Sequence, residues 1–452
     1  MRVVIVGAGI SGLSLATFLR RLNIDCVVLE QSPFLQAQYI TPYVLFANAL
    51  SCFKAFNMDH IFTNVHVEPE EHFGIKNSKR QWLMKVRNRH VQMHALGSED
   101  VIPLSTAPTA NSNSIVSRRL AEERKINLGK VPFRTTLSAT YLRDALRRHI
   151  PEIKFGATVV DLVPHDGIKG GVMVMLEDGS SEYGDVVVGA DGMHSTIRKL
   201  LYPSEVVGLS SRSLGMTQID GFVDTPHNVE GLECPVHHWG HRCALWTVPL
   251  FRHNENRISF SATLYDQPEE VLDTAMDAKD VLVAFRQLMH RQYLPFGEDI
   301  ARLLSQATLA IPSEVLEVPV MPRWYNKRAV LIGEAAHGSL PSFLEQDASL
   351  CVEDAALLAT ALTDIPLLRD SGFEYAFKQF ETVRRERVER YIRQSRRARS
   401  VAATRYTGLR DTVFKCTPSS TVYLSQKWLS SWSYSSQQLE VDPKTKVETA
   451  FR

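Results

Sequence analysis

The first thirty residues, MRVVIVGAGISGLSLATFLRRLNIDCVVLE, constrain the fold more than any other stretch of the chain. Residues 3–6 are a β-branched run that suits a buried parallel strand. Gly7, Gly9 and Gly12 follow with the spacing G-x-G-x-x-G. This spacing permits a sharp turn, lets a pyrophosphate approach the backbone and lets a helix pack on the strand. A second apolar run ends at the acid Glu30, which suits a ribose, so the sequence predicts an adenine dinucleotide site.

Composition places the chain among ordinary folded proteins. Its 452 residues are enough for two or three packed units, and 44% of them are hydrophobic. The net charge of +1 gives no electrostatic reason to expect a nucleic acid or an anionic membrane as partner. No apolar run reaches the roughly 18 residues of a transmembrane helix. The apolar start is interrupted by glycines and lacks a cleavage site, so it does not read as a signal peptide.

The six cysteines form no C-x-x-C pair and no spacing typical of a metal site. Reduced thiols are the default for such a pattern, so we expect a cytoplasmic protein without a bound metal. Cys26 and Cys351 lie in apolar stretches and are expected to be packing residues.

Two later segments repeat the pattern of a buried strand, a turn and a helix. The segment DVVVGADGMHSTIRKLL carries Asp191 and Gly192 in its turn. In RAVLIGEAAHGSLPSFLEQDASL a strand ends at Gly333 with the acid Glu334 beside it, and a proline-containing loop then leads into another helix. Neither segment is specific alone.

Together and in this order, the three segments resemble the FAD-dependent aromatic hydroxylases, the single-component flavoprotein monooxygenases typified by para-hydroxybenzoate hydroxylase. The resemblance covers nearly the whole chain, and an E-x-x-R-x-x-R at Glu381, Arg384 and Arg387 matches that family's closing helix. Length and insertions are most similar to fungal tailoring enzymes of secondary metabolism. The resemblance implies an α/β fold with a Rossmann-like FAD-binding domain, an interleaved β-sheet substrate domain and C-terminal helices.

The resemblance also implies domain boundaries. The FAD-binding domain would be discontinuous and comprise residues 1–70, 134–205 and 325–370. The substrate domain would comprise residues 71–133 and 206–324, and the helical region residues 371–452. Within the substrate domain, the mixed-charge segment 118–130 is expected to be the solvated face of a helix.

Cofactor contacts follow from the same resemblance. The glycine loop would hold adenosine and pyrophosphate, the Asp-Gly pair would lie near the pyrophosphate, and the third segment would reach the ribityl chain and the flavin ring. The implied contact residues are Gly7, Gly9, Gly12, Glu30, Asp191, Gly192, Gly333, Glu334, Pro341, Gln346 and Asp347.

The implied chemistry is monooxygenation with FAD as cofactor and NAD(P)H as electron donor. NAD(P)H reduces the flavin, O2 adds at C4a, and the hydroperoxide gives one oxygen atom to an electron-rich ring or alkene. The substrate would be a hydrophobic small molecule of aromatic polyketide, alkaloid or meroterpenoid type. Two alternatives keep the fold: a non-redox FAD-binding cyclase or isomerase, and a non-catalytic flavin-bound partner of a pathway enzyme.

The third segment departs from the family pattern at the flavin end. Glu334 replaces the usual aspartate, and Glu345, Gln346 and Asp347 stand where Gly-Gln-Gly is expected. Carboxylates there have the wrong sign beside the negative edge of a reduced flavin. We therefore expect a displaced loop whose carboxylates face solvent, with Asp347 suited to cap the next helix.

A further departure lies in SATYLRDAL. The arginine that the family places before two helical leucines falls on Ala139 here, and Arg134 or Arg143 could replace it from nearby. With three changes in one site, weakened or altered redox activity is one outcome to test.

Residues 206–270 are rich in strand-forming and aromatic residues and would supply the sheet that covers the flavin. His237 and His238 lie there and are candidates for a base that removes a phenolic proton, as is Tyr43. For each of the three, a packing role is the competing interpretation.

Overall fold

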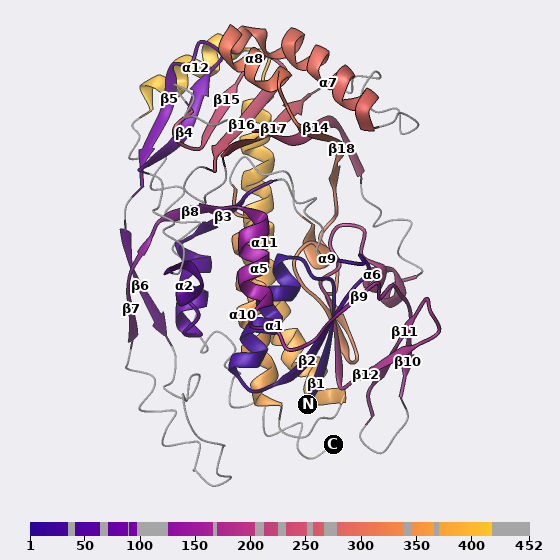
Figure 1. The fold of residues 1–452 in the computed structure, drawn as a ribbon. Helices are drawn as coiled ribbons and strands as arrows, with labels where there is room; N and C mark the ends of the chain where they lie inside the picture. The colour runs from indigo at the N-terminus through magenta and orange to yellow at the C-terminus, as the bar shows by residue number, and fades with distance from the viewer. Residues whose placement is uncertain are drawn as a thin grey trace.

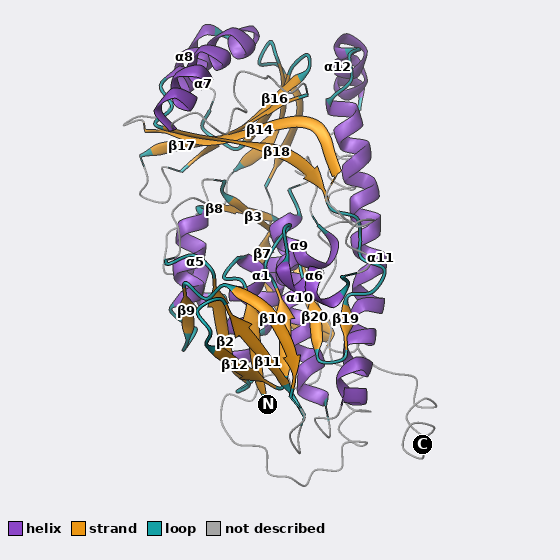
Figure 2. Cartoon of the chain, turned by 90° about the vertical axis from the view of Figure 1, so that its right-hand side faces the viewer, coloured by secondary structure: helices purple, strands orange, loops and turns teal. Residues whose placement is uncertain are grey.

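The computed structural model describes residues 1–34, 41–63, 71–88, 90–96, 125–165, 170–203, 212–224, 232–250, 256–265, 278–338, 345–365 and 370–417. In these ranges the chain forms two large sheets, a lower and an upper one in the view of Figure 1, with helices around each. A long helix, α11 (Asp370–Ala402), runs alongside both sheets (Figure 2). No helix in the described part of the chain is long and apolar enough to cross a bilayer.

The lower sheet has the strand order β19-β20-β13-β1-β2-β9 and is parallel except between β19 and β20. Its strands are β1 (Arg2–Val6), β2 (Asp25–Glu30), β9 (Ile153–Phe155), β13 (Val186–Gly189), β19 (Tyr325–Asn326) and β20 (Ala329–Leu331). β13 and β20 are buried throughout, as strands covered on both faces require. The three motif-bearing segments therefore supply adjacent strands, and their turns meet at one edge of the sheet. The predicted Rossmann-like α/β fold is confirmed.

Helices pack around this sheet. α1 (Ile10–Arg21) is buried from Ile10 to Leu19 and packs against α10 (Asp347–Ala361), which is itself almost wholly buried. The other helices of this part are α2 (Ala47–Ala55), α3 (His60–Thr63), α5 (Ala139–Arg147), α6 (Thr196–Leu201) and α9 (Glu334–His337). Three small sheets join β3 (Tyr43–Phe46) to β8 (Arg134–Leu137), β6 (His90–Leu96) to β7 (Lys125–Pro132), and β10 (Val159–Pro164) through β11 (Val172–Leu176) to β12 (Ser181–Gly184).

The upper sheet has the order β18-β14-β17-β16-β15-β4-β5 and is antiparallel except between β15 and β4. Its strands are β4 (His72–Asn77), β5 (Trp82–Arg87), β14 (Arg212–Asp224), β15 (Val236–Trp239), β16 (Cys243–Pro249), β17 (Arg257–Leu264) and β18 (Leu309–Glu317). α7 (Ala278–Tyr293) and α8 (Glu298–Ser305) cover its outer face (Figure 2). Leu245 and Phe260 point into the core beneath these helices, so the alternate residues of the same strands face the other way, toward the lower sheet.

The last described helices are the C-terminal helices that the resemblance implies. α11 buries an apolar stripe that includes Phe373, Phe377 and Phe380 and exposes arginines on its other side, as an amphipathic surface helix does. α12 (Thr407–Cys416) follows it. One prediction is wrong: the described end of segment 118–130 lies in strand β7, because pairing with β6 decides its structure and its charges do not. The domain boundaries given above stay predictions.

Candidate cofactor and substrate site

The glycine loop consists of two positions that exclude side chains and one that is open. Gly7 has a φ of +106°, and a Cβ there would lie 2.4 Å from the carbonyl oxygen of Ala190. A Cβ on Gly12 would lie 2.0 Å from the carbonyl oxygen of Gly7. At Gly9 a Cβ would meet nothing within 4 Å. Gly7 and Gly12 therefore fix the loop against β13 and α1, while Gly9 leaves room for a ligand to approach the backbone.

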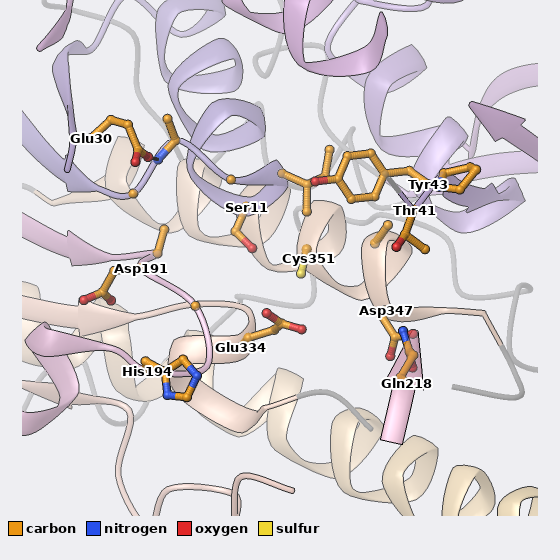
Figure 3. Close-up of a pocket in the computed structure, with 18 of the residues that line it drawn as sticks. Ser11, Glu30, Thr41, Tyr43, Asp191, His194, Gln218, Glu334, Asp347 and Cys351 are labelled. Carbon is orange, nitrogen blue, oxygen red and sulfur yellow. Dashed lines mark hydrogen bonds between the residues drawn. The ribbon is translucent and has the colours of Figure 1, made fainter. Parts of the chain in front are cut away.

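A cavity of about 520 Å³ starts at this loop and continues to the inner face of the upper sheet (Figure 3). The predicted residues that line it are Gly7, Gly9, Glu30, Tyr43, Asp191, Gly192, His237, Glu334 and Asp347. Four predicted residues are not in its wall: Gly12, Gly333, Gln346 and His238. Pro341 lies outside the described residues.

Other lining residues were not identified from the sequence. They include Ser11, Thr41, His194, Met216, Gln218, Ser261, Thr263 and Cys351. Gln218 and Ser261 alternate along β14 and β17 with apolar residues that face α7 and α8. That alternation is the sequence signal that could have placed them on the cavity side.

Glu30 lies at the nucleotide end of the cavity. Its two carboxylate oxygens accept hydrogen bonds from the backbone N–H of Ala8 (2.8 Å) and of Ser32 (2.9 Å). Arg143 of α5 donates to the carbonyl oxygen of Ala8 at 3.4 Å. Of the two arginines proposed to replace the one missing at Ala139, Arg143 is thus the one that reaches the glycine loop.

The turns after β13 and β20 lie side by side. Asp191 accepts hydrogen bonds from the Ser195 hydroxyl (2.5 Å) and the Ile197 backbone N–H (3.0 Å), which holds the start of α6. Burial raises the pKa of Asp191 above its ordinary value, although these bonds oppose the rise. A Cβ on Gly192 would lie 3.9 Å from Glu334 Oε2, so the second and third motifs meet at the cavity wall.

Glu345 corrects the expectation that the carboxylates of this loop face solvent. Its side chain is only 9% exposed and lines the cavity. Its Oε1 accepts a hydrogen bond from Arg134 at 2.9 Å and lies 2.9 Å from His237 Nε2. Burial would raise the pKa of Glu345, but Arg134 and His237 outweigh it and hold the pKa below its ordinary value. The prediction was wrong because Arg134 and His237, both remote in sequence, hold the buried carboxylate through an ion pair and a hydrogen bond.

The capping role expected for Asp347 is also wrong. The residue at the N-cap of α10 is Gln346, which makes no side-chain capping bond, and Asp347 is the first residue of the helix. Its carboxylate accepts a hydrogen bond from the Tyr391 hydroxyl of α11 at 3.1 Å. Gln346 is buried and accepts from Asn48 Nδ2 at 3.2 Å, away from the cavity wall.

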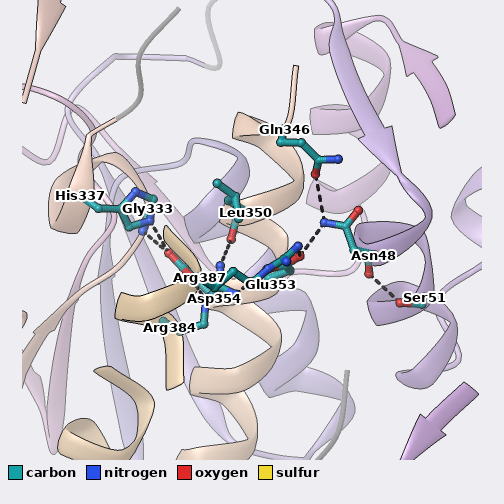
Figure 4. Close-up of polar contacts among 10 residues, drawn as sticks. All are labelled: Asn48, Ser51, Gly333, His337, Gln346, Leu350, Glu353, Asp354, Arg384 and Arg387. Atoms are coloured by element: carbon teal, nitrogen blue, oxygen red, sulfur yellow. Dashed lines mark hydrogen bonds and ion pairs between the residues drawn. The ribbon is translucent and has the colours of Figure 1, made fainter. Parts of the chain in front are cut away.

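A buried ionic network links α10 to α11 and to the turn at Gly333 (Figure 4). Asp354 accepts from the Gly333 N–H (2.8 Å) and from Arg384 Nε (2.6 Å), and it lies 2.9 Å from His337 Nε2. Arg384 also pairs with the neighbouring acid of α10, Glu353. Burial would raise the pKa of Asp354, but Arg384 and His337 lower it to about 2. The first arginine of the E-x-x-R-x-x-R sequence therefore has a structural role.

The two histidines of β15 point in opposite directions. His238 is fully buried with its edge against Phe296, and burial lowers the pKa of His238 to about 3. His238 does not reach the cavity, so it is not placed to act as a base on a substrate there. His237 lines the cavity and stacks on Trp246, its partner on β16, with ring centroids 5.7 Å apart.

Comparisons with known proteins agree with this arrangement. A family model for an NAD(P)-binding Rossmann-like domain matches residues 5–55. The 2-heptyl-3-hydroxy-4(1H)-quinolone synthase of Pseudomonas aeruginosa is 26% identical over 365 residues, which are 79% of this chain and 80% of that enzyme. FAD-dependent monooxygenase pynG of Aspergillus niger is 24% identical over 383 residues, 80% of this chain and 78% of the relative. The crystal structure of Klebsiella pneumoniae HpxO with FAD and uric acid has a TM-score of 0.71 at 18% identity, covers 95% of this chain and 96% of that chain, and shares its fold.

Fold and site together define an FAD-binding α/β protein in which a Rossmann-like sheet and a second sheet share one cavity. Within that class, the relatives and the structural neighbours support the resemblance to the FAD-dependent aromatic hydroxylases, and the protein is an FAD-dependent monooxygenase with NAD(P)H as electron donor. The relatives above come from a bacterium and a fungus, so a fungal origin stays a prediction.

The residues at both ends of the cavity fit FAD. The open position at Gly9, the N-terminus of α1 and the carboxylate of Glu30 suit a pyrophosphate and a ribose. At the other end, the carboxylate of Glu345 is neutralised by Arg134, so it does not oppose a flavin that becomes negative on reduction.

Proposed function

We propose that this monooxygenase oxygenates a planar, hydrophobic small molecule of aromatic polyketide, alkaloid or meroterpenoid type. The observation that carries the proposal is the single cavity that joins the glycine loop to the inner face of the upper sheet. Cofactor and substrate would share this space, with the substrate against Trp246 and Met216. Bound FAD, reduced by NAD(P)H, uses O2 to supply an electrophilic oxygen atom, and the second oxygen leaves as water.

The side chains around the substrate would exclude water and hold a proton. Trp246, Met216 and Ala244 form an apolar part of the wall. We propose His237 as the residue that accepts a proton from the substrate, because an ionised Glu345 can only accept the hydrogen bond from Nε2. The proton on Nε2 leaves Nδ1 as the basic nitrogen, and the carboxylate stabilises the ring once it is protonated. Tyr43 lines the same cavity and stays a candidate.

The function is tested with purified, FAD-loaded protein. Candidate substrates, starting with alkyl 4(1H)-quinolones because one relative is named for such a compound, should speed NAD(P)H consumption with matching O2 uptake. Mass spectrometry should find a product heavier by one oxygen atom. NAD(P)H consumption that no aromatic compound stimulates would contradict the proposal.

A second candidate function is favoured by the contact between Glu345 and His237. A buried carboxylate beside an imidazole can move protons without any redox step, as a cyclase or isomerase needs. The two functions separate under anaerobic conditions without NAD(P)H. Substrate conversion there supports the non-redox enzyme, and conversion only with NAD(P)H and O2 supports the monooxygenase. A flavin-bound protein that converts nothing yet binds a pathway enzyme would point to the partner role.

A further inference from the structure

The charged side chains of the cavity wall are nearly all acidic. Five carboxylates line it: Glu30, Asp191, Glu334, Glu345 and Asp347. Among the described residues, the wall contains no lysine and no arginine, and its only side chains that can become cations are those of His194 and His237. A carboxylated aromatic ligand needs a cation or several aligned N–H groups to replace its water. The described wall offers such a ligand no permanently positive side chain.

The arginine beside Glu345 is already paired. Arg134 is only 1% exposed, and its guanidinium donates to Glu345 Oε1 at 2.9 Å. The backbone of Glu345 has a φ of +54°, in the left-handed region that favours glycine. This conformation costs a residue other than glycine about 1 kcal/mol. The glycine of the family pattern is thus replaced by a residue whose carboxylate neutralises the charge of Arg134.

Two side chains of the cavity wall each have an acceptor atom that no described residue uses. His237 donates through Nε2 to Glu345, and no described residue binds its Nδ1. Gln218 donates through Nε2 to both oxygens of Asp220, at 3.1 and 2.9 Å. A carboxylate acceptor fixes the amide orientation, so Gln218 Oε1 is directed away from Asp220.

Asp220 is held firmly enough to fix that orientation. Its carboxylate has hydrogen bonds with Ser261, Gln218 and Thr41, which come from three different segments. Burial raises the pKa of Asp220, and these three bonds oppose the rise. Gln218, Ser261 and Thr41 all line the cavity, so the polar part of the wall is fixed before any substrate binds.

From this distribution of charge and acceptors, and on the basis of the proposed function, we infer the substrate class. The site selects a neutral or cationic aromatic or heteroaromatic molecule that donates hydrogen bonds from ring N–H or O–H groups to His237 Nδ1 and Gln218 Oε1. It rejects carboxylated rings of the hydroxybenzoate type. Glu345 is the residue that sets this rejection, because it removes the free charge of Arg134.

The first test measures binding alone. Oxidised, FAD-loaded protein without NAD(P)H is titrated with 3-hydroxybenzoate, with its neutral amide 3-hydroxybenzamide, and with 4(1H)-quinolone and its N-methyl derivative. The change in flavin absorbance and fluorescence reports each Kd. We expect the amide to bind at least about tenfold more tightly than the acid, and the quinolone at least about tenfold more tightly than its N-methyl derivative. Equal or tighter binding of 3-hydroxybenzoate overturns the inference.

Variants then test the residues. Glu345→Gln leaves the charge of Arg134 uncompensated, so the Kd of 3-hydroxybenzoate should fall about tenfold relative to that of the amide. A double variant, Glu345→Gln with Arg134→Met, removes both charges and covers the case in which the single variant folds poorly. It should keep the wild-type preference for the amide. Gln218→Leu should remove the difference between the quinolone and its N-methyl derivative. Glu317→Gln, which removes an ion-paired carboxylate outside the cavity, should change none of these values.

These results separate the inference from the proposed function. The expected binding order without substrate-stimulated NAD(P)H consumption would support the substrate class and contradict monooxygenation. Oxygenation of a hydroxybenzoate in preference to neutral rings would support monooxygenation and overturn the substrate class. An unchanged Kd of 3-hydroxybenzoate in a well-folded Glu345→Gln protein would refute the role given to Glu345.

Discussion

At the scale of single residues, the glycine loop predicts two different effects of the same small substitution. Gly12→Ala places a Cβ 2.0 Å from the Gly7 carbonyl oxygen, so we expect the free energy of unfolding of the FAD-free protein to fall by about 1–3 kcal/mol. Gly9→Ala meets nothing within 4 Å and should leave that free energy unchanged while weakening FAD binding. Urea denaturation and FAD titration measure the two effects. Equal destabilisation by both alanines would show that Gly9 is structural.

His238 gives a second prediction at this scale, on the pH dependence of stability. Burial lowers the pKa of His238 from 6.5 to about 3, so between these values the unfolded chain binds a proton that the folded chain does not. Stability is therefore lost as the pH falls below about 6.5, by about 2 kcal/mol from this group between pH 7 and pH 5. His238→Leu should reduce the loss over that range in urea denaturation. An identical pH dependence in both proteins would contradict a buried neutral ring.

Among the secondary-structure elements, the contact between α10 and α11 is predicted to depend on one buried arginine. Arg384→Met leaves Glu353 and Asp354 buried with less compensating charge, so we expect the protein to lose about 3–5 kcal/mol of stability. Arg390→Met on the exposed face of the same helix is the matched control and should change stability by less than about 0.5 kcal/mol. Thermal and urea unfolding measure both. A loss of similar size in the two variants would mean that the network adds nothing beyond the helix itself.

The elements also show what could be predicted from the sequence. The strand-turn-helix segments carry their signal locally, as glycine spacing between a buried strand and a helix, and they were predicted. The strand β7 and the salt bridge between Arg134 and Glu345 were not, because they depend on partners far away in the chain. Local sequence patterns indicate whether a segment is a helix or a strand. Which residue pairs with a buried charge depends on how the elements pack together.

For the whole molecule, the shared cavity predicts that one ligand stabilises both sheets. The cavity is lined by residues 7–11 beside the lower sheet and by Trp246 and Ser261 of the upper sheet. FAD at about 100 times its Kd should raise the free energy of unfolding by about 2.7 kcal/mol. Hydrogen exchange should slow in the loop after β1 and also in β15 and β16, because opening either part would release the cofactor.

Which strands show slower hydrogen exchange with FAD tests where the isoalloxazine ring of the cofactor lies. ADP can fill only the nucleotide end of the cavity, so it should slow exchange in the glycine loop and leave β15 and β16 unchanged. Gly9→Ala should weaken both patterns together, since it acts where the two ligands share the pyrophosphate. Protection by FAD that stays within the lower sheet would place the ring outside the space beneath Trp246 and His237. The substrate would then have to meet the flavin somewhere other than at the inner face of the upper sheet.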